Sequence, residues 1–509
     1  MKSIYISGIC LMLVIGITSC SDVLEQSDPN AVTVDDYFVS ENDVQLAVNG
    51  IYQSLRSSDA VGENSGLYTD ERSDDTGTND NQSNSGEPFQ FNNFSLLPSN
   101  TWLKNHWVAL YQTITRANIV LSNIDKVTFA DADTKSKLSA ESKFLRAYTY
   151  FQLVRKWGDV PLVTRQLKTT AEITEFTARV KKEEVYNQIV TDLKDALGSP
   201  LANLQTGANV GKVSKAAANA LLGQVYLTMA TTLDQSDKAA NLASAKIYLE
   251  AAYGMKTFGS LKEIPYTDVF DVSKKSTCPE LIFQIVNKQG DLNYSSSIAA
   301  NTQAKGETIN SLKPSTGTGA IVTHDLVNDY EPGDLRKDFS IKYASDVTVQ
   351  DWFITKFRDA STTAGVNGYG GNDWVLIRYA DVILMLAEVN MYLGNEAAAI
   401  SYLDMVRERA KMPSYANSKT DAAYSSKYPT LKLAILHERR VELAFEHHRW
   451  FDLLRTFTTP ELITYIQSKK QLDFGNAKVS NFTAKDRYYP IPFDENKLDP
   501  VKMYQNEGY

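Results

Sequence analysis

The sequence predicts a mainly α-helical protein in which tetratricopeptide-like helix pairs form a scaffold for a loop-rich, short-strand region. The first observation is the stretch 376–410, whose apolar residues recur at three- and four-residue steps on either side of Gly394 and Asn395, as in a helical hairpin. The second is a pair of Ala-rich stretches, 214–230 and 241–253, with spaced aromatic residues typical of tetratricopeptide units. One hairpin cannot bury its own apolar stripe, so we expect these helices to stack on one another.

Composition and charge restrict the possible functions. The chain has 509 residues, of which 43% are hydrophobic and 22% are charged, as in ordinary globular proteins. The formal net charge is -9 and the sequence pI is about 5.3. A surface with this charge repels the phosphate backbone of nucleic acids on average, so we expect no nucleic-acid partner.

The N-terminus predicts export. Lys2 is followed by an apolar stretch, 4–17, that is too short to span a bilayer, which is typical of a signal peptide over residues 1–19. The sequence Ile-Thr-Ser-Cys, ending at Cys20, resembles the bacterial lipoprotein box, in which the cysteine becomes the first mature residue and is acylated. An ordinary signal peptide cleaved nearby, with Cys20 incidental, is the alternative.

The cysteines favour lipidation at Cys20. The chain has three cysteines; Cys10 is lost with the leader and Cys278 is left alone, so no internal disulfide is available. Several acyl chains hold a protein on a membrane without a spanning helix. We therefore expect a membrane-attached protein whose residues 20–36 form a polar tether.

An N-terminal helical part is expected at residues 37–258. Its first helix runs from Glu41 to Leu55, and a long loop rich in Gly, Ser, Asn and Asp follows at 59–100, where the composition cannot sustain a helix or a core. Apolar periodicity then predicts helices at 107–124, 141–154 and 182–197, followed by the two Ala-rich helices.

The C-terminal part, 259–509, begins with a region that lacks helical periodicity, 259–372. Short strands are expected there at Leu281–Val286 and Trp352–Phe357, among long loops of the kind that usually carry function. A helical section, 373–470, contains the hairpin and a charged helix at 432–455, and an extended, proline-containing tail follows.

The charged helix suggests a metal site but does not complete one. His437 and Glu438 begin like a zinc-protease helix, yet Val441 stands where the second histidine is required. Glu442 and Glu446 continue from Glu438 at four-residue steps among arginines, which predicts an ion-paired packing network. We expect no metal, no cofactor and no catalytic residue, although paired carboxylates for glycosidic cleavage stay open.

Six blocks of the sequence resemble the SusD/RagB family of outer-membrane lipoproteins from Bacteroidetes. They are SCSDVLE, WVALYQTITRANIVLSNID, AESKFLRAYTYFQLVRKWGDVPLV, RYADVILMLAEVNMYLGN, ERRVELAFEHHRWFDLLR and YYPIP, and they run in the family's order from Cys20 to Pro492. The resemblance implies four tetratricopeptide-like helix pairs and a loop-rich ligand face. It also implies a surface-exposed, non-catalytic lipoprotein that captures oligosaccharides with a SusC-like TonB-dependent transporter.

Aromatic and polar residues in the loops are the candidates for glycan contact. A sugar stacks its C–H face on an aromatic ring while its hydroxyl groups form hydrogen bonds with polar side chains. The candidates are Tyr68, Arg72, Asp74, Asn79, Phe89, Trp102, Asn293, Tyr294, Trp352, Tyr369 and Asn372. For each ring the alternative is packing beneath its own loop, an alternative that is strongest for Trp102 and Trp352.

Two other functions stay open. One is binding of peptides or proteins by the same fold, and the other is hydrolysis of glycans at the cell surface. The sequence does not identify the glycan, its linkage or the partner transporter, nor whether a structural calcium is bound.

Overall fold

The computed structural model describes residues 34–77, 86–291, 293–296, 298, 302, 321–344, 350–365, 370–470 and 479–509. The signal peptide, Cys20, most of the tether and the candidate residues Asn79 and Tyr369 lie outside these ranges. Within them, no helix is both long enough and apolar enough to cross a bilayer.

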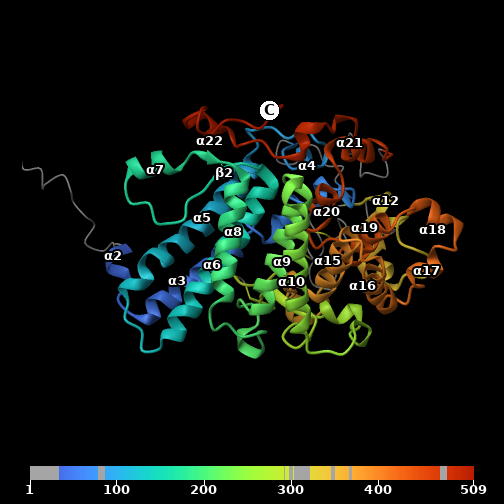
Figure 1. Cartoon of the computed structure of the whole chain (residues 1–509), viewed down its shortest axis with the longest axis horizontal. Helices are drawn as coiled ribbons and strands as arrows, with labels where there is room; N and C mark the ends of the chain where they lie inside the picture. Colours follow the sequence, from blue (N-terminus) through green and yellow to red (C-terminus); the bar gives the residue numbers. More distant parts are fainter. Residues whose placement is uncertain are drawn as a thin grey trace, which may run out of the picture.

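The N-terminal part is a layer of long helices, drawn from blue to green in Figure 1. The first long helix begins at a capping box formed by Ser40 and Asp43, and its apolar stripe faces the core. The helices of this part are α2 (Val34–Tyr37), α3 (Glu41–Leu55), α4 (Phe89–Asn92), α5 (Thr101–Asn123), α6 (Ala132–Trp157), α7 (Thr170–Phe176), α8 (Lys182–Leu197), α9 (Lys215–Thr232) and α10 (Lys238–Gly254).

The C-terminal part packs against this layer and also contains helix pairs (Figure 1). Its helices are α12 (His324–Val327), α13 (Leu335–Ser340), α14 (Thr362–Gly365), α15 (Tyr379–Tyr392), α16 (Glu396–Arg409), α17 (Tyr415–Ser418), α18 (Ala422–Lys427), α19 (Leu431–Glu442), α20 (Arg449–Thr456), α21 (Thr459–Gln467) and α22 (Phe493–Leu498). The predicted hairpin is confirmed as α15 and α16, with Gly394 at φ 78° in the turn between them.

Stacking of the helix pairs is confirmed. Helix α5 packs on α6, α9 on α10 and α15 on α16, while α10 also contacts α15 and so joins the two parts. Helices α9 and α10 approach closely at Gly223, where a Cβ atom would lie 2.5 Å from Cγ of Leu249. A larger residue at this position would therefore separate the pair.

The strands are short and antiparallel. A four-stranded sheet has the order β1 (Thr76–Gly77), β5 (Ile321–Val322), β7 (Trp352–Ile354), β6 (Ile341–Tyr343). Two further pairs join β2 (Val160–Pro161) to β3 (Arg179–Val180) and β4 (Leu281–Ile285) to β8 (Trp374–Arg378). Strand β8 includes Leu376, so the prediction that helix begins there is wrong; its run of apolar residues fits a buried strand equally well.

Two other predictions about secondary structure and burial are wrong. The expected helix at 432–455 is divided into α19 and α20, because Phe445 and His447 adopt positive φ angles of 65° and 66° between them. The stretch 59–100 does contribute to the core, because strand β1 pairs with β5 and several of its charged residues are buried beside partners.

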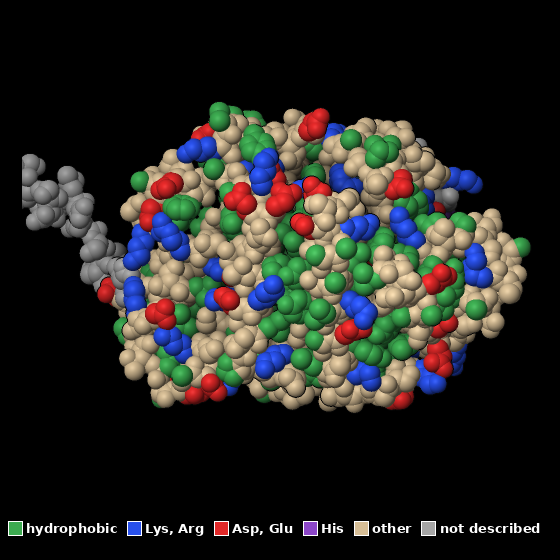
Figure 2. Space-filling view, in the orientation of Figure 1, with side chains coloured by type: hydrophobic (Ala, Val, Ile, Leu, Met, Phe, Trp, Pro, Cys, Tyr) green, Lys and Arg blue, Asp and Glu red, His purple; other side chains and the backbone are tan. Residues whose placement is uncertain are grey.

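The surface seen in Figure 2 carries charges of both signs, scattered among hydrophobic side chains. No continuous basic band crosses this face.

Candidate functional site

The charged residues of α19 form a buried ion-pair network, as predicted. Arg378, at the end of β8, is at its centre: Nη1 donates to Glu280 and Glu442 at 2.6 and 2.7 Å, and Nε donates to Glu446 at 2.6 Å. Lys356 donates to the other oxygen of Glu446 at 2.6 Å. All five side chains are almost fully buried. The ion pairs join Glu442 of α19 to Arg378 of β8. Because every charge in the cluster has an opposite partner, the cluster has no free base or nucleophile.

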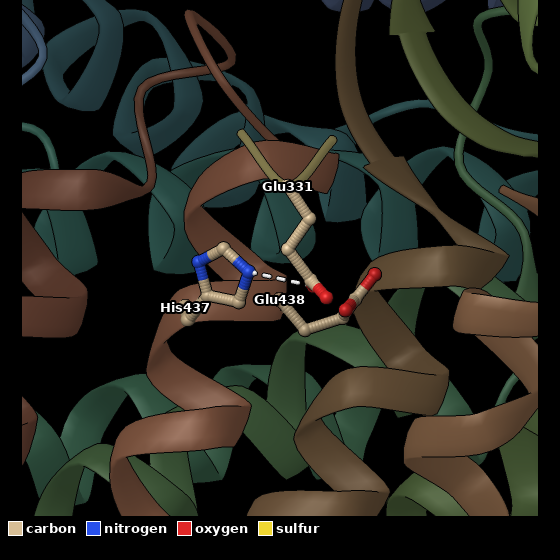
Figure 3. Close-up of side chains that lie close together, drawn as sticks. All are labelled: Glu331, His437 and Glu438. Atoms are coloured by element: carbon tan, nitrogen blue, oxygen red, sulfur yellow. Dashed lines mark hydrogen bonds and ion pairs between the residues drawn. The ribbon is translucent and has the colours of Figure 1, made fainter. Parts of the chain in front are cut away.

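One part of this network has the composition of a metal site. Ligand atoms of Glu331, His437 and Glu438 lie within 4.8 Å of one another. Figure 3 shows the three side chains close together. However, Arg407 donates to both carboxylates at 2.8 and 2.9 Å, and Arg336 donates to Glu438 at 2.6 Å. Two guanidinium groups already neutralise the oxygens that a cation would need, so we interpret the cluster as structural.

The buried His437 makes the stability of this cluster depend on pH. Burial opposes protonation, but the carboxylates of Asp329 and Glu331 outweigh it and raise the pKa of His437 above its usual 6.5. The stabilisation from the charged imidazole is therefore complete below the unfolded-state pKa and is lost as pH rises through the folded-state pKa.

We expect His437→Gln to lower the free energy of unfolding most below about pH 6, by about 1–3 kcal/mol, with a decreasing effect toward about pH 8. Urea denaturation of both proteins across this range measures the difference. A difference that does not change with pH would contradict the assignment.

An exposed aromatic ring on the loop after β4 is the best candidate for ligand contact. Tyr294 is 49% exposed, and its neighbour Asn293 is also exposed. The guanidinium carbon of Arg56, at the end of α3, lies 5.3 Å from the centre of the Tyr294 ring. Here an aromatic face stands beside polar groups, which is the combination that a sugar requires.

The loop that carries Tyr294 is fixed by hydrogen bonds. The carboxylate of Asp291 accepts from the backbone N–H groups of Asn293 and Tyr294 at 2.9 and 3.1 Å. The turn needs Gly290, whose φ is 72° and whose added Cβ would lie 3.1 Å from the carbonyl oxygen of Thr363. A ring held in place in this way loses little conformational entropy when it binds a ligand.

Arg56 connects this loop to the scaffold. Its Nη1 donates to the carbonyl of Asn293 at 2.9 Å, and its Nη2 donates to Ser295 at 3.1 Å and to the Asn287 side chain at 3.0 Å. Asn287 in turn donates to the carbonyl of Asn372 at 2.8 Å. The structure thus joins three predicted residues, Asn293, Tyr294 and Asn372, although Asn372 is buried and supports the loop from beneath.

Three other candidates, Tyr68, Arg72 and Asp74, are buried and not at the surface; for Tyr68 this agrees with the alternative of packing beneath its own loop. Tyr68 is fully buried and stacks on His106 with ring centres 3.9 Å apart. Arg72 is fully buried and donates to the carbonyl of Asp486 at 2.7 Å. Asp74 is fully buried and accepts from Arg449 at 2.6 Å. Each contacts a group more than 30 residues away in the chain, namely His106, Asp486 and Arg449, and the local polar composition does not reveal these contacts.

The remaining aromatic candidates are half-buried. Trp102 and Trp352 pack against the main core, as their alternative interpretation predicts, and Phe89 opens the short helix α4. The ring of Trp352 lies edge-on to exposed Tyr343 at 5.7 Å. Contact of these three rings with ligand stays a prediction.

Sequence reasoning missed Arg56 and Asn287. Neither is aromatic, and Arg56 lies at a helix end outside the two loop regions, whereas Asn287 is one of several polar residues within the irregular region 259–372. Arg56 follows the last residue of α3, and its only sequence signal is a long basic side chain at a helix end. Such residues are common at helix ends for electrostatic reasons, so this signal is weak.

Two protein-family models match different parts of the chain. A family model described as the SusD family matches residues 340–509, and another described as "Starch-binding associating with outer membrane" matches residues 22–227. SusD-like protein P2 of Formosa agariphila is 27% identical over 533 residues, and the alignment covers 100% of both chains.

Solved structures are similar over nearly the whole chain. A protein described as a laminarin binding SusD-like protein is 26% identical with a TM-score of 0.74, covering 93% of this chain and 100% of its own. Surface glycan-binding protein A from Bacteroides thetaiotaomicron, in complex with laminarihexaose, is 20% identical with a TM-score of 0.73, covering 92% and 100%. The second likeness shows a shared fold.

Proposed function

The chain belongs to the SusD/RagB family, and we propose that it is a cell-surface protein that binds a glycan without altering it. Family members are non-catalytic glycan-binding proteins, and a relative over the full length is described as laminarin binding. These likenesses support a saccharide as the ligand and a β-glucan as the first compound to test.

The observation that carries the proposal is the exposed, fixed ring of Tyr294 beside Asn293 and Arg56. The C–H face of a pyranose can stack on this ring, because Tyr294 is 49% exposed. The side-chain amide of Asn293 can both donate to and accept from sugar hydroxyl groups. Together these residues supply one apolar and several polar contacts on a rigid loop.

Calorimetric titration with a panel of neutral polysaccharides and their oligosaccharides, including laminarin and laminarihexaose, tests the proposal. We expect saturable binding of at least one member and no release of shorter sugars during prolonged incubation. A folded protein that binds no glycan of a broad panel would contradict the proposed function. Release of sugar with time would contradict the non-catalytic role.

We further propose that the protein is held at the outer membrane by a lipid on Cys20 and acts with a SusC-like TonB-dependent transporter. The family's association with the outer membrane and the lipoprotein-like sequence before Cys20 support this arrangement. A membrane-attached binding protein raises the local concentration of glycan at the transporter, since both are confined to the same surface.

Cys20→Ala is expected to release most of the protein from the membrane fraction, because acylation requires the thiol. Cell fractionation followed by immunoblotting measures the change, with Cys278→Ala as the matched control that stays membrane-bound. Equal membrane association of wild type and Cys20→Ala would contradict lipid attachment at this residue.

A further inference from the structure

A pocket rich in basic residues lies where the start of α8 and the end of α9 meet the C-terminal segment, which is drawn in red at the top of Figure 1. Its volume, mouth included, is about 400 Å³. The wall has an apolar side and a polar side, and the polar side holds three basic side chains and no acidic one. The polar residues are Arg155, Lys182, Tyr186, Thr228, Thr232, Arg487 and Tyr488.

The two arginines of this pocket form no ion pair with any described residue. Arg487 donates to the backbone carbonyls of Leu454 and Phe457, at 2.7 and 3.3 Å. Arg155 donates to the carbonyl of Phe151 at 3.1 Å, and its guanidinium carbon lies 3.9 and 3.6 Å from the ring centres of Phe151 and Phe451. Backbone carbonyls use some of the N–H groups but supply no counter-charge.

Other buried arginines of the chain, in contrast, are paired with carboxylates. Arg378, Arg439 and Arg455 each contact at least one carboxylate within 3 Å. Asp452, which is the acidic group that acts electrostatically on Arg155, is already bound by Arg439 and Arg455 at 2.9 Å each. Burial lowers the pKa of Arg155 to about 10 and also lowers the pKa of Arg487, in agreement with a shortage of negative charge.

The third basic residue of the pocket, Lys182, also lacks a carboxylate partner among the described residues. Nζ of Lys182 lies 3.4 Å from the hydroxyl of Tyr488 and forms no ion pair with any described residue. Its neighbour Lys181 is instead paired with Asp159 at 3.3 Å. Tyr488 donates its own O–H to no described group, so it is available to an acceptor in the pocket. The acidic residues of the first turn of α8 are exposed and lie outside the lining.

From these contacts we infer that the pocket binds a small oxyanion, with Lys182, Arg487 and the Tyr488 hydroxyl as its donors and Arg155 as a charge behind them. The oxyanion is either a free ion, such as sulfate or phosphate, or the acidic group of a saccharide. The apolar side of the pocket, which includes Leu233 and Leu454, suits the carrier of such a group. This site is independent of Tyr294 and does not rest on the proposed glycan contact there.

Equilibrium dialysis with radiolabelled sulfate, at constant ionic strength in chloride, tests the inference. We expect saturable binding of sulfate to the full chain, and a loss of about tenfold or more in affinity for Lys182→Gln and for Arg487→Gln, since each removes a charge-assisted hydrogen bond. Lys181→Gln is the matched control: it removes the same charge from the adjacent residue and is expected to change the affinity less than twofold. Thermal unfolding confirms that the variants are folded.

Two further arms identify the source of the oxyanion. A sulfated oligosaccharide that binds this pocket more tightly than sulfate, and competes with it, indicates a saccharide group, whereas equal or weaker binding indicates the free ion. Tyr294→Ala is expected to leave sulfate binding unchanged, which separates this site from the proposed glycan contact. The inference is overturned if sulfate and phosphate do not bind to the folded protein, or if Lys181→Gln weakens binding as much as Lys182→Gln.

Discussion

Arg378→Met is expected to lower the free energy of unfolding by about 3–5 kcal/mol, the usual cost of removing one partner from a buried ion pair. Arg378 contacts Glu280, Glu442 and Glu446, and all four side chains are almost completely shielded from water. Burial alone would raise the pKa of Glu446, but Arg378 and Lys356 hold it at about 2. Without Arg378, Glu446 keeps only Lys356 among the described residues, and Glu280 keeps only Arg409, which it shares with Glu442, so the buried negative charge is less well compensated.

Arg165→Met is the matched control for this prediction. Arg165 pairs with Glu172 at 2.7 Å, but its side chain is 46% exposed, so we expect a loss below about 1 kcal/mol. Urea denaturation followed by circular dichroism measures both variants. If Arg378→Met costs no more than Arg165→Met, the network does not stabilise the contact between α19 and the sheet in the way described.

Tyr294→Ala is expected to weaken glycan binding by about tenfold or more while leaving the fold intact. Removal of an aromatic ring at the centre of a binding surface typically costs more than about 1.4 kcal/mol, which corresponds to a factor of ten. Because Tyr294 is 49% exposed, its loss leaves no cavity in the core. Calorimetric titration with the glycan found in the panel measures the effect.

Two variants make this prediction specific. Tyr294→Phe keeps the ring and is expected to retain most of the affinity, because the stacking surface is unchanged. Tyr37→Ala removes another exposed tyrosine, in α2, and is expected to have no effect. Equal affinity of wild type and Tyr294→Ala would contradict the assigned contact, even if the protein binds glycan elsewhere.

The helical scaffold could be predicted from the sequence because its signals are local. The predicted helix at 182–197 agrees with α8 at both ends, and Gly394 and Asn395 correctly divide α15 from α16. The division between α19 and α20 was not predicted. Apolar spacing continues through Phe445, and nothing in the composition indicates that it and His447 adopt positive φ angles.

The buried charges could not be predicted because their partners are distant in the chain. Asp74 lies in a stretch with the composition of a surface loop, yet it accepts from Arg449, which is 375 positions further along. Burial of a charge depends on such a partner, whereas composition reports only that the stretch is polar. This is also why Arg72 appeared to be a candidate for ligand contact.

The candidate site could be predicted in part. Tyr294 and Asn293 follow from the chemistry of sugar binding, since an aromatic residue in a polar loop is the feature that this chemistry needs. Arg56 could not be predicted, because its role depends on α3 ending beside a loop more than 230 residues away in the sequence. Its contacts to the carbonyls of Asn293 and Ser295 are visible only in three dimensions.

A crystal structure of the complex with the tightest-binding oligosaccharide tests the central claim most directly. We expect a sugar ring stacked on Tyr294, with the side chain of Asn293 within hydrogen-bonding distance of its hydroxyl groups. A saccharide bound on another face, with the Tyr294 ring uncovered, would contradict this claim.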